Sequence, residues 1–192
     1  MNKNIGKRCL NLALLIAYIF SIVYFFMNKE IVNLSISIAC LLGTIVLYIV
    51  NQKNSKLIDN NLYIVLVLFI LFSSLLGTCY RFYDIINRYD DFLHVWSGFI
   101  SVSVAFAILN YLNKDEVVIK ISKLFIVIYL FMFSMGVASL WEIMEFLLDT
   151  FCGLNTQAGG LTDTVVDMID ALVGSIIMIP IIIRKTKSKY KK

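Results

Sequence analysis

Six long runs of apolar residues constrain this chain more than any other feature. Each run approaches the length of about 20 residues that an α-helix needs to cross the hydrocarbon core of a bilayer. The sequence is 60% hydrophobic and 16% charged, with a mean hydropathy of +0.85, whereas soluble domains are far more polar. The sequence therefore predicts an all-α, polytopic membrane helical bundle with about six transmembrane helices.

The runs follow one another without an obvious linker, internal repeat or low-complexity segment, so we expect a single transmembrane domain over residues 1–192. The first run follows a basic N-terminus, but it is too long for a signal peptide and no small-residue cleavage site follows it. It is therefore interpreted as an uncleaved anchor. The predicted spans are Cys9–Met27, Ile31–Val50, Leu62–Tyr80, Phe92–Leu112, Ile121–Leu148 and Leu161–Ile183.

The net charge of +4 does not indicate a nucleic-acid partner, because the basic residues gather at the N-terminus, in alternate loops and in a tail at 184–192. Outside the tail, eight of the eleven basic residues follow this pattern, namely Lys3, Lys7, Arg8, Lys53, Lys56, Lys114, Lys120 and Lys123, while Lys29, Arg81 and Arg88 lie in the remaining loops. The positive-inside rule then places both termini on the cytoplasmic side of a bacterial inner or plasma membrane. An even number of spans agrees with this topology. The basic tail fits an anchor on anionic membrane lipid.

The four cysteines have no metal-binding spacing. The predicted topology places Cys79 and Cys152 near the outer surface. Unpaired thiols in an apolar setting are the favoured interpretation, and a disulfide between these two residues stays open.

Acidic residues collect on the predicted outer side of three spans, and those of the last span show a helical spacing. Asp163, Asp167 and Asp170 are four and three residues apart, so they share one helix face, which Gly174 continues. Asp170 should lie about 10 Å deeper than Asp163. An aspartate at the centre of a membrane helix costs about 2.5–3.5 kcal/mol, so these side chains should face the bundle interior or a wet cavity.

Several carboxylates in one cavity need compensation for their mutual repulsion, which a bound metal ion, protonation or pairing with cationic side chains could supply. The residues predicted as metal ligands are Asp90, Asp91, His94, Glu142, Glu145, Asp163 and Asp167, and the surrounding polar network is predicted to include Arg81, Arg88, Asp149 and Asp170. Such an oxygen-rich set with one imidazole suits Mg²⁺, Mn²⁺ or Ca²⁺, and Zn²⁺ stays open. A purely structural network that fixes helix register is the alternative.

Three motifs carry a resemblance: "YDDFLHVWSGF" at Tyr89–Phe99, "LWEIMEFLLD" at Leu140–Asp149 and "DTVVDMIDALVG" at Asp163–Gly174. In this order they resemble the YjdF-like family of bacterial inner-membrane proteins, which implies a fold and a location more than an activity. A weaker similarity is to VanZ-like proteins, which also place an Asp four residues before a His at a helix start. The sequence departs from them at Glu142 and Glu145, so glycopeptide resistance is not carried over.

Three functions fit these features. The first is a site in the outer half of the bundle that binds a divalent cation, a polar lipid or envelope headgroup, or another small ligand. The second is a metal-dependent membrane hydrolase or transferase that acts on an envelope lipid. The third is a proton- or cation-coupled transporter, although the inner halves of the spans are nearly devoid of ionisable residues. The sequence shows no signal for an oligomeric state.

Overall fold

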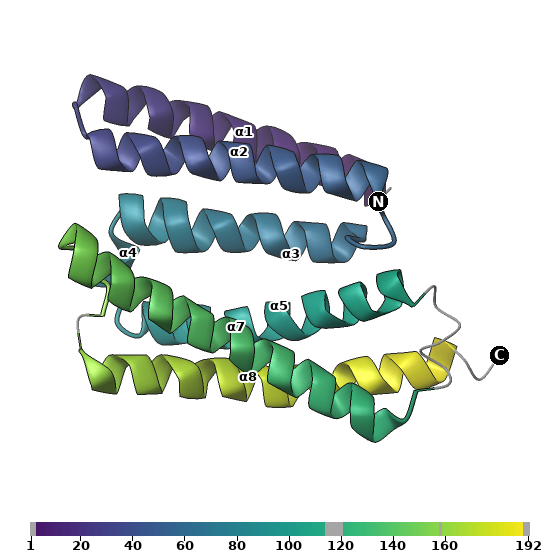
Figure 1. The fold of residues 1–192 in the computed structure, drawn as a ribbon. Helices are drawn as coiled ribbons and strands as arrows, with labels where there is room; N and C mark the ends of the chain where they lie inside the picture. The colour runs from purple at the N-terminus through teal and green to yellow at the C-terminus, as the bar shows by residue number, and fades with distance from the viewer. Residues whose placement is uncertain (1–2, 114–120, 158, 190–192) are drawn as a thin grey trace. The chain divides into compact units, whose positions relative to one another are not determined.

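The computed structural model describes residues 3–113, 121–157 and 159–189, and this part of the chain is helical without strands, as predicted (Figure 1). The predicted loop positions Lys114 and Lys120 and the end of the tail, 190–192, lie outside the described residues. The elements are α1 Lys3–Met27, α2 Ile31–Lys53, α3 Asn60–Ile70, the π-helix η1 Leu71–Cys79, α4 Phe82–Ile85, α5 Tyr89–Leu112, α7 Lys123–Cys152 and α8 Leu161–Lys189.

Six of the described segments are long and apolar enough to cross a membrane, which confirms the predicted multi-pass bundle. They are Ile5–Met27, Ile31–Lys53, Asn60–Cys79, Tyr89–Leu112, Lys123–Cys152 and Leu161–Arg184. The fifth begins two residues after its predicted start, behind an N-cap at Ser122, whose hydroxyl accepts a hydrogen bond from the Phe125 amide. It ends at Gly153, whose φ of 66° suits glycine.

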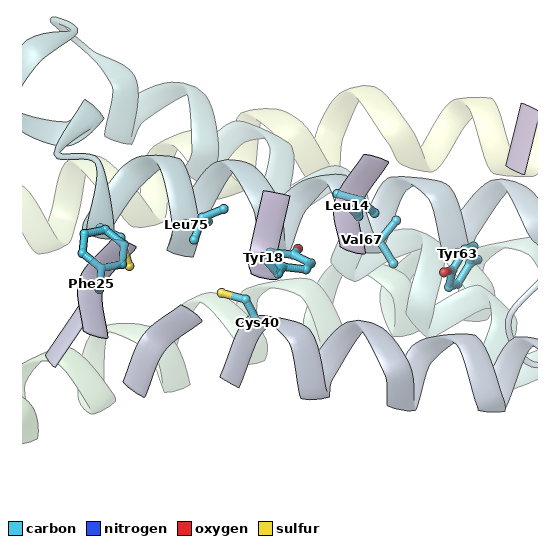
Figure 2. Packing of buried hydrophobic residues seen from close by; sticks show 8 residues of the cluster. Leu14, Tyr18, Phe25, Cys40, Tyr63, Val67 and Leu75 are labelled. Atoms are coloured by element: carbon cyan, nitrogen blue, oxygen red, sulfur yellow. The ribbon is translucent and has the colours of Figure 1, made fainter. Parts of the chain in front are cut away.

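The first compact unit, residues 1–89, contains α1, α2, α3, η1 and α4. Its core joins side chains from α1, α2, α3 and η1, including Tyr18, Tyr63 and Val67, each fully buried (Figure 2). The third span changes from α to π geometry at Leu71, and the amide of Tyr80 donates to the carbonyl of Leu75 five residues earlier. The sequence analysis did not foresee this wider turn.

The second compact unit, residues 90–192, contains the rest of α5 together with α7 and α8. Helix α7 crosses α8 obliquely (Figure 1). Where α5 meets α8, a Cβ at Gly98 would overlap with the Ala171 carbonyl, and a Cβ at Gly174 would overlap with the Val95 carbonyl. Both glycines are therefore required for this close backbone approach, and Gly174 continues the acidic face predicted from the sequence.

Each unit has its own apolar core, and a single domain over the whole chain stays a prediction. Helix α8 continues through Arg184 to Lys189, so most of the predicted basic tail is an extension of the last helix. All four cysteines are free thiols, with Cys79 buried and Cys152 exposed.

Candidate metal site

The acidic residues of the second unit meet where α5 begins, α7 ends and α8 begins. Asp90 and Asp91 lie in the first turn of α5, and Asp163 lies in the first turn of α8. A helix N-terminus carries a partial positive charge and unpaired amides, which explains why these turns tolerate carboxylates. From this end, His94, Glu142 and Asp167 project into the interior with exposed fractions of only 8%, 5% and 2%.

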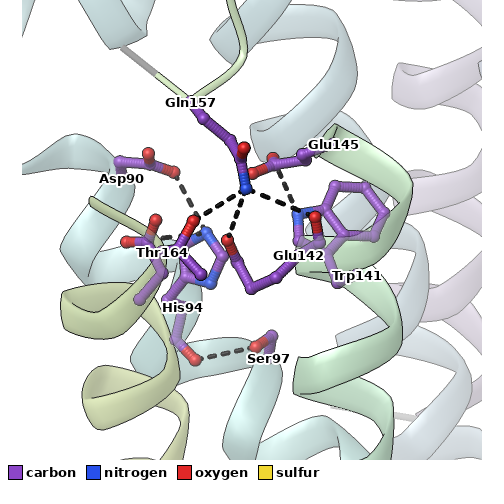
Figure 3. Close-up of polar contacts among 9 residues, drawn as sticks. Asp90, His94, Ser97, Trp141, Glu142, Glu145, Gln157 and Thr164 are labelled. Atoms are coloured by element: carbon purple, nitrogen blue, oxygen red, sulfur yellow. Dashed lines mark hydrogen bonds and ion pairs between the residues drawn. The ribbon is translucent and has the colours of Figure 1, made fainter. Parts of the chain in front are cut away.

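His94 is the only described side chain in the cluster that can carry a positive charge. Its Nε2 atom lies 3.4 Å from Asp90 Oδ1, one helical turn earlier on α5, and 3.8 Å from Asp167 Oδ1 on α8 (Figure 3). The Ser97 hydroxyl donates to the His94 carbonyl oxygen at 2.7 Å. The imidazole edge thus faces carboxylates from two helices, a setting that suits either an ion pair or shared metal coordination.

Among the described residues, three combinations of His, Asp or Glu side chains bring three ligand atoms within 4.8 Å of one another. Asp167 belongs to all three. These combinations are Asp90, His94 and Asp167; Asp91, Asp167 and Asp170; and Glu142, Glu145 and Asp167. An ion at the centre of such a triangle would lie no more than about 2.8 Å from each ligand atom, so modest side-chain movement reaches the distances of Ca²⁺, about 2.3–2.6 Å, or Mg²⁺, about 2.0–2.1 Å. Asp167 is therefore the centre of the cluster.

The carboxylates of this cluster differ in how their oxygens are satisfied. Glu145 accepts a hydrogen bond from Trp141 Nε1 at 2.9 Å, and Glu142 Oε2 accepts one from Gln157 Nε2 at 3.5 Å. Asp167 Oδ2 is buried and accepts no hydrogen bond from any residue that the structure describes. A buried, unsatisfied carboxylate oxygen is costly in a protein interior, and its position among further carboxylates leaves room for a cationic ligand.

Asp149 of α7 binds the segment between α7 and α8 through hydrogen bonds to Thr156 and Gln157. Asp149 Oδ1 accepts from the amide and the hydroxyl of Thr156, both at 2.7 Å, and Oδ2 accepts from the Gln157 amide at 2.9 Å. Gln157 Nε2 in turn donates to Thr164 Oγ1 at 2.7 Å and to the Glu142 carbonyl oxygen at 3.3 Å (Figure 3). These hydrogen bonds connect the segment after α7 to the backbone of Glu142 and to α8.

The structure thus brings together most of the residues predicted as ligands: Asp90, Asp91, His94, Glu142, Glu145 and Asp167. Asp163 is half-buried and stands outside the three combinations, whereas Asp170, predicted only for the network, belongs to one of them. Asp149 serves the segment that follows α7. Arg81, in the first unit, contacts Asp84 at 2.8 Å between two exposed side chains, Arg88 of the same unit is exposed, and their place in the network stays a prediction.

The sequence analysis missed Thr156, Gln157 and Thr164. They lie in or next to the polar segment "CGLNTQAGG", and neutral side chains in such a segment follow no spacing rule that predicts a partner. The signal nearest to them is Asp149, three residues before the end of α7, because an aspartate side chain readily accepts hydrogen bonds from backbone amides near a helix end.

Comparison with known proteins places the chain among membrane proteins. The family model described as "Predicted membrane protein (DUF2238)" matches residues 8–188. A protein of Thermotoga maritima described as "Uncharacterized protein" is 34% identical over 122 residues, which cover 61% of this chain and 59% of that protein. The match therefore spans less than two thirds of the relative's length. No solved structure matches the chain. The chain belongs to the DUF2238 family of predicted membrane proteins.

Proposed function

We propose that this membrane protein binds a divalent cation between α7 and α8, with Glu142, Glu145 and Asp167 as its ligands. These three carboxylates have ligand atoms within 4.8 Å of one another and include no positive charge. The observation that carries the proposal is Asp167 Oδ2, a buried oxygen that no described residue satisfies. Oxygen ligands of this kind suit Mg²⁺, Mn²⁺ or Ca²⁺.

A cation also resolves the repulsion within the cluster better than the protein's own groups. The three combinations contain six carboxylates and the single histidine. Arg81 is paired with Asp84 at the surface, where solvent screens its charge. A polar headgroup with a cationic amine is the alternative ligand, but an amine brings one charge and a divalent ion brings two.

Binding is favoured over transport because the same three helices continue into an apolar cluster beyond the site. Val102 and Ala105 on α5 and Leu130 on α7 are fully buried in this cluster, together with Leu109, Ile126, Ile179 and Ile182. A transport pathway would need polar or wet surroundings through this layer. The proposed site is consequently a pocket for a bound ion at one end of the unit.

The proposal extends to the membrane in which the protein lies and to the side on which the site opens. The order of the three motifs supports a YjdF-like protein of the bacterial inner membrane. The positive-inside rule supports cytoplasmic termini and hence a site in the outer leaflet. Cysteine labelling tests this topology in a background where the exposed Cys9 and Cys152 are replaced by serine. Arg88→Cys should react with an impermeant reagent in intact cells, and reaction only after permeabilisation would reverse the topology.

Cation binding is tested on purified, chelator-treated protein by thermal melting with Mg²⁺, Mn²⁺, Ca²⁺ or Zn²⁺. At a free concentration of 100 times the Kd, one bound ion stabilises the folded state by about 2.7 kcal/mol. Asp167→Asn should abolish this gain, because it removes the central ligand. Asp84→Asn, the same chemical change at an exposed residue, should keep it. The proposal fails if no cation raises the melting temperature and elemental analysis finds none in the purified protein.

A further inference from the structure

We infer that the site holds two divalent cations bridged by Asp167, one on the α7 side and one on the α5 side. This inference rests on the proposed function, which requires only one ion. It adds a second set of ligands, Asp90 and His94, and a specific role for the Asp167 carboxylate.

In two of the three combinations that contain Asp167, the other two members come from one helix, and that helix differs between the two combinations. Asp90 and His94 belong to α5, whereas Glu142 and Glu145 belong to α7. Each pair combines with Asp167 into a set whose ligand atoms lie within 4.8 Å of one another, and no residue other than Asp167 is shared between these two sets. In the view of Figure 3, Asp90 lies on the left and Glu145 on the right, with His94 and Glu142 between them.

The α5 set has distances suited to a metal. Octahedral bonds of about 2.0–2.2 Å, the geometry of Mg²⁺ and Mn²⁺, place neighbouring ligand atoms about 2.8–3.1 Å apart. His94 Nε2 lies 3.4 Å from Asp90 Oδ1 and 3.8 Å from Asp167 Oδ1, so the imidazole and both carboxylates need to move little to bind one ion. In that state His94 is neutral and offers its Nε2 lone pair.

Asp167 has one oxygen for each ion. Its Oδ1 atom faces His94, and its buried Oδ2 atom accepts no hydrogen bond from the described residues. A carboxylate that bridges two metals uses both oxygens, and ions in two-metal sites lie about 3.5–4 Å apart. Asp167 is the only side chain whose position fits both described sets, and its exposed fraction of 2% keeps it in place.

The charges of the cluster favour two ions over one. Two divalent cations offset four of the six carboxylates in the three combinations, whereas one offsets two. Mn²⁺ accepts both imidazole and carboxylate ligands, so it suits the α5 set with His94 and the α7 set alike. Mg²⁺ is better matched to the all-oxygen α7 set. In the one-ion arrangement, a protonated His94 pairs with Asp90 and Asp167, and the α7 set alone holds metal.

The number of bound ions separates these arrangements. The protein as purified in detergent is stripped with chelator, loaded with excess Mn²⁺ and freed of unbound ion by gel filtration. Two Mn²⁺ per chain, with the electron paramagnetic resonance spectrum broadened by coupling between neighbouring ions, is the expected result. One Mn²⁺ with an uncoupled spectrum overturns the bridged pair and leaves the proposed function intact. No bound Mn²⁺, Mg²⁺, Ca²⁺ or Zn²⁺ overturns both.

Isosteric variants assign the two positions. Asp90→Asn and Glu142→Gln should each reduce binding to one uncoupled Mn²⁺, since each removes a ligand from a different set. Asp167→Asn should remove the coupling in every case. Asp84→Asn, at an exposed residue paired with Arg81, should retain two coupled ions. Each variant is first shown by its elution profile and melting temperature to be folded. Two coupled ions in folded Asp90→Asn and Glu142→Gln proteins would contradict the assignment.

Discussion

The two units of the molecule each bury a charged side chain, and they treat it in opposite ways. In the first unit, Lys7 is only 9% exposed, and its ammonium group donates to Asn51 Oδ1 and, at 3.0 Å, to Asn60 Oδ1. The same nitrogen lies 4.9 Å from the ring centre of Tyr63. In the second unit, Asp167 is buried more deeply and one of its oxygens accepts no hydrogen bond from the described residues.

This difference separates a charge whose partners are all supplied by the protein from the charge on which the proposed cation site depends. The neutral oxygens and aromatic faces around Lys7 satisfy the cation without another charge, and Asn51 also donates to the Ile58 carbonyl at 2.8 Å, which fixes the turn after α2. Around Asp167 the neighbours are further carboxylates and one histidine. Burial of a charge therefore does not by itself identify a ligand site, and it is the unsatisfied oxygen of Asp167 that supports the proposed one.

The largest effect should come from the close approach of α5 and α8 that positions Asp167 opposite His94. Gly174→Ala places a methyl group against the Val95 carbonyl, so the helices must separate. We expect a loss of about 1–3 kcal/mol in folding free energy and a weaker response to cations. Gly136→Ala is the matched control, because a Cβ there meets nothing within 4 Å. Equal melting temperatures for the two variants would show that the close contact between α5 and α8 at Gly174 does not contribute to stability.

The next effect separates stability from binding in the first unit. Lys7→Met removes the donor to Asn51 and Asn60 and leaves the buried Asn51 Oδ1 with only the long hydrogen bond from Gln52 at 3.4 Å. Because an acceptor left fully unsatisfied costs about 1–3 kcal/mol, the loss should lie toward the lower end of that range. The melting temperature should fall, while the rise caused by a saturating cation should equal that of the unsubstituted protein. Arg8→Met is the control, since Arg8 is exposed and should change neither quantity. A reduced cation response in Lys7→Met would show that the first unit contributes to the site.

The contrast between these regions also shows what a sequence can supply. Six spans follow from apolar length alone, and helical spacing places Asp163, Asp167, Asp170 and Gly174 on one face. The gathering of His94 with Glu142 and Asp167 follows from their shared position at the ends of their helices. These features depend on periodicity and span order, which are local properties of the chain.

Other features depend on tertiary geometry that no spacing rule contains. Lys7 was interpreted only as part of a basic N-terminus, and its burial arises because α1 begins at Lys3, six residues before the predicted start of the span. Whether Asp163 or Asp170 joins the ligand combinations depends on helix rotation and on the close contact at Gly98. The hydrogen bonds of Asp149 to Thr156 and Gln157 depend on the path of the segment after Gly153.

A smaller effect is expected from Asp149 on α7 than from Asp167 on α8. Asp149 is fully satisfied by the amides of Thr156 and Gln157, unlike Asp167. Asp149→Asn weakens these bonds, so cleavage between residues 150 and 160 by added protease should become several-fold faster, with the bound cation retained. Asp149→Glu, which keeps the charge, should restore part of the protection. Unchanged cleavage in Asp149→Asn would mean that these hydrogen bonds do not hold the segment.

The smallest effect concerns the exposed ion pair. Arg81 and Asp84 retain side-chain exposures of 76% and 60%, and surface pairs of this kind contribute about 0–1 kcal/mol. Arg81→Gln should therefore leave both the melting temperature and the cation-induced rise nearly unchanged. If the cation-induced rise increased substantially instead, Arg81 would be acting as a competing charge at the acidic site.

The most direct test of the account is the position of a bound ion. Crystals of the full chain grown with Mn²⁺ and measured near the manganese absorption edge give an anomalous difference map independent of any assumption about ligands. The account predicts a peak within bonding distance of Asp167, adjoining Glu142 and Glu145, and no peak beside Lys7. Manganese located only at surface carboxylates such as Asp84, with Asp167 in contact solely with His94 and water, would contradict it.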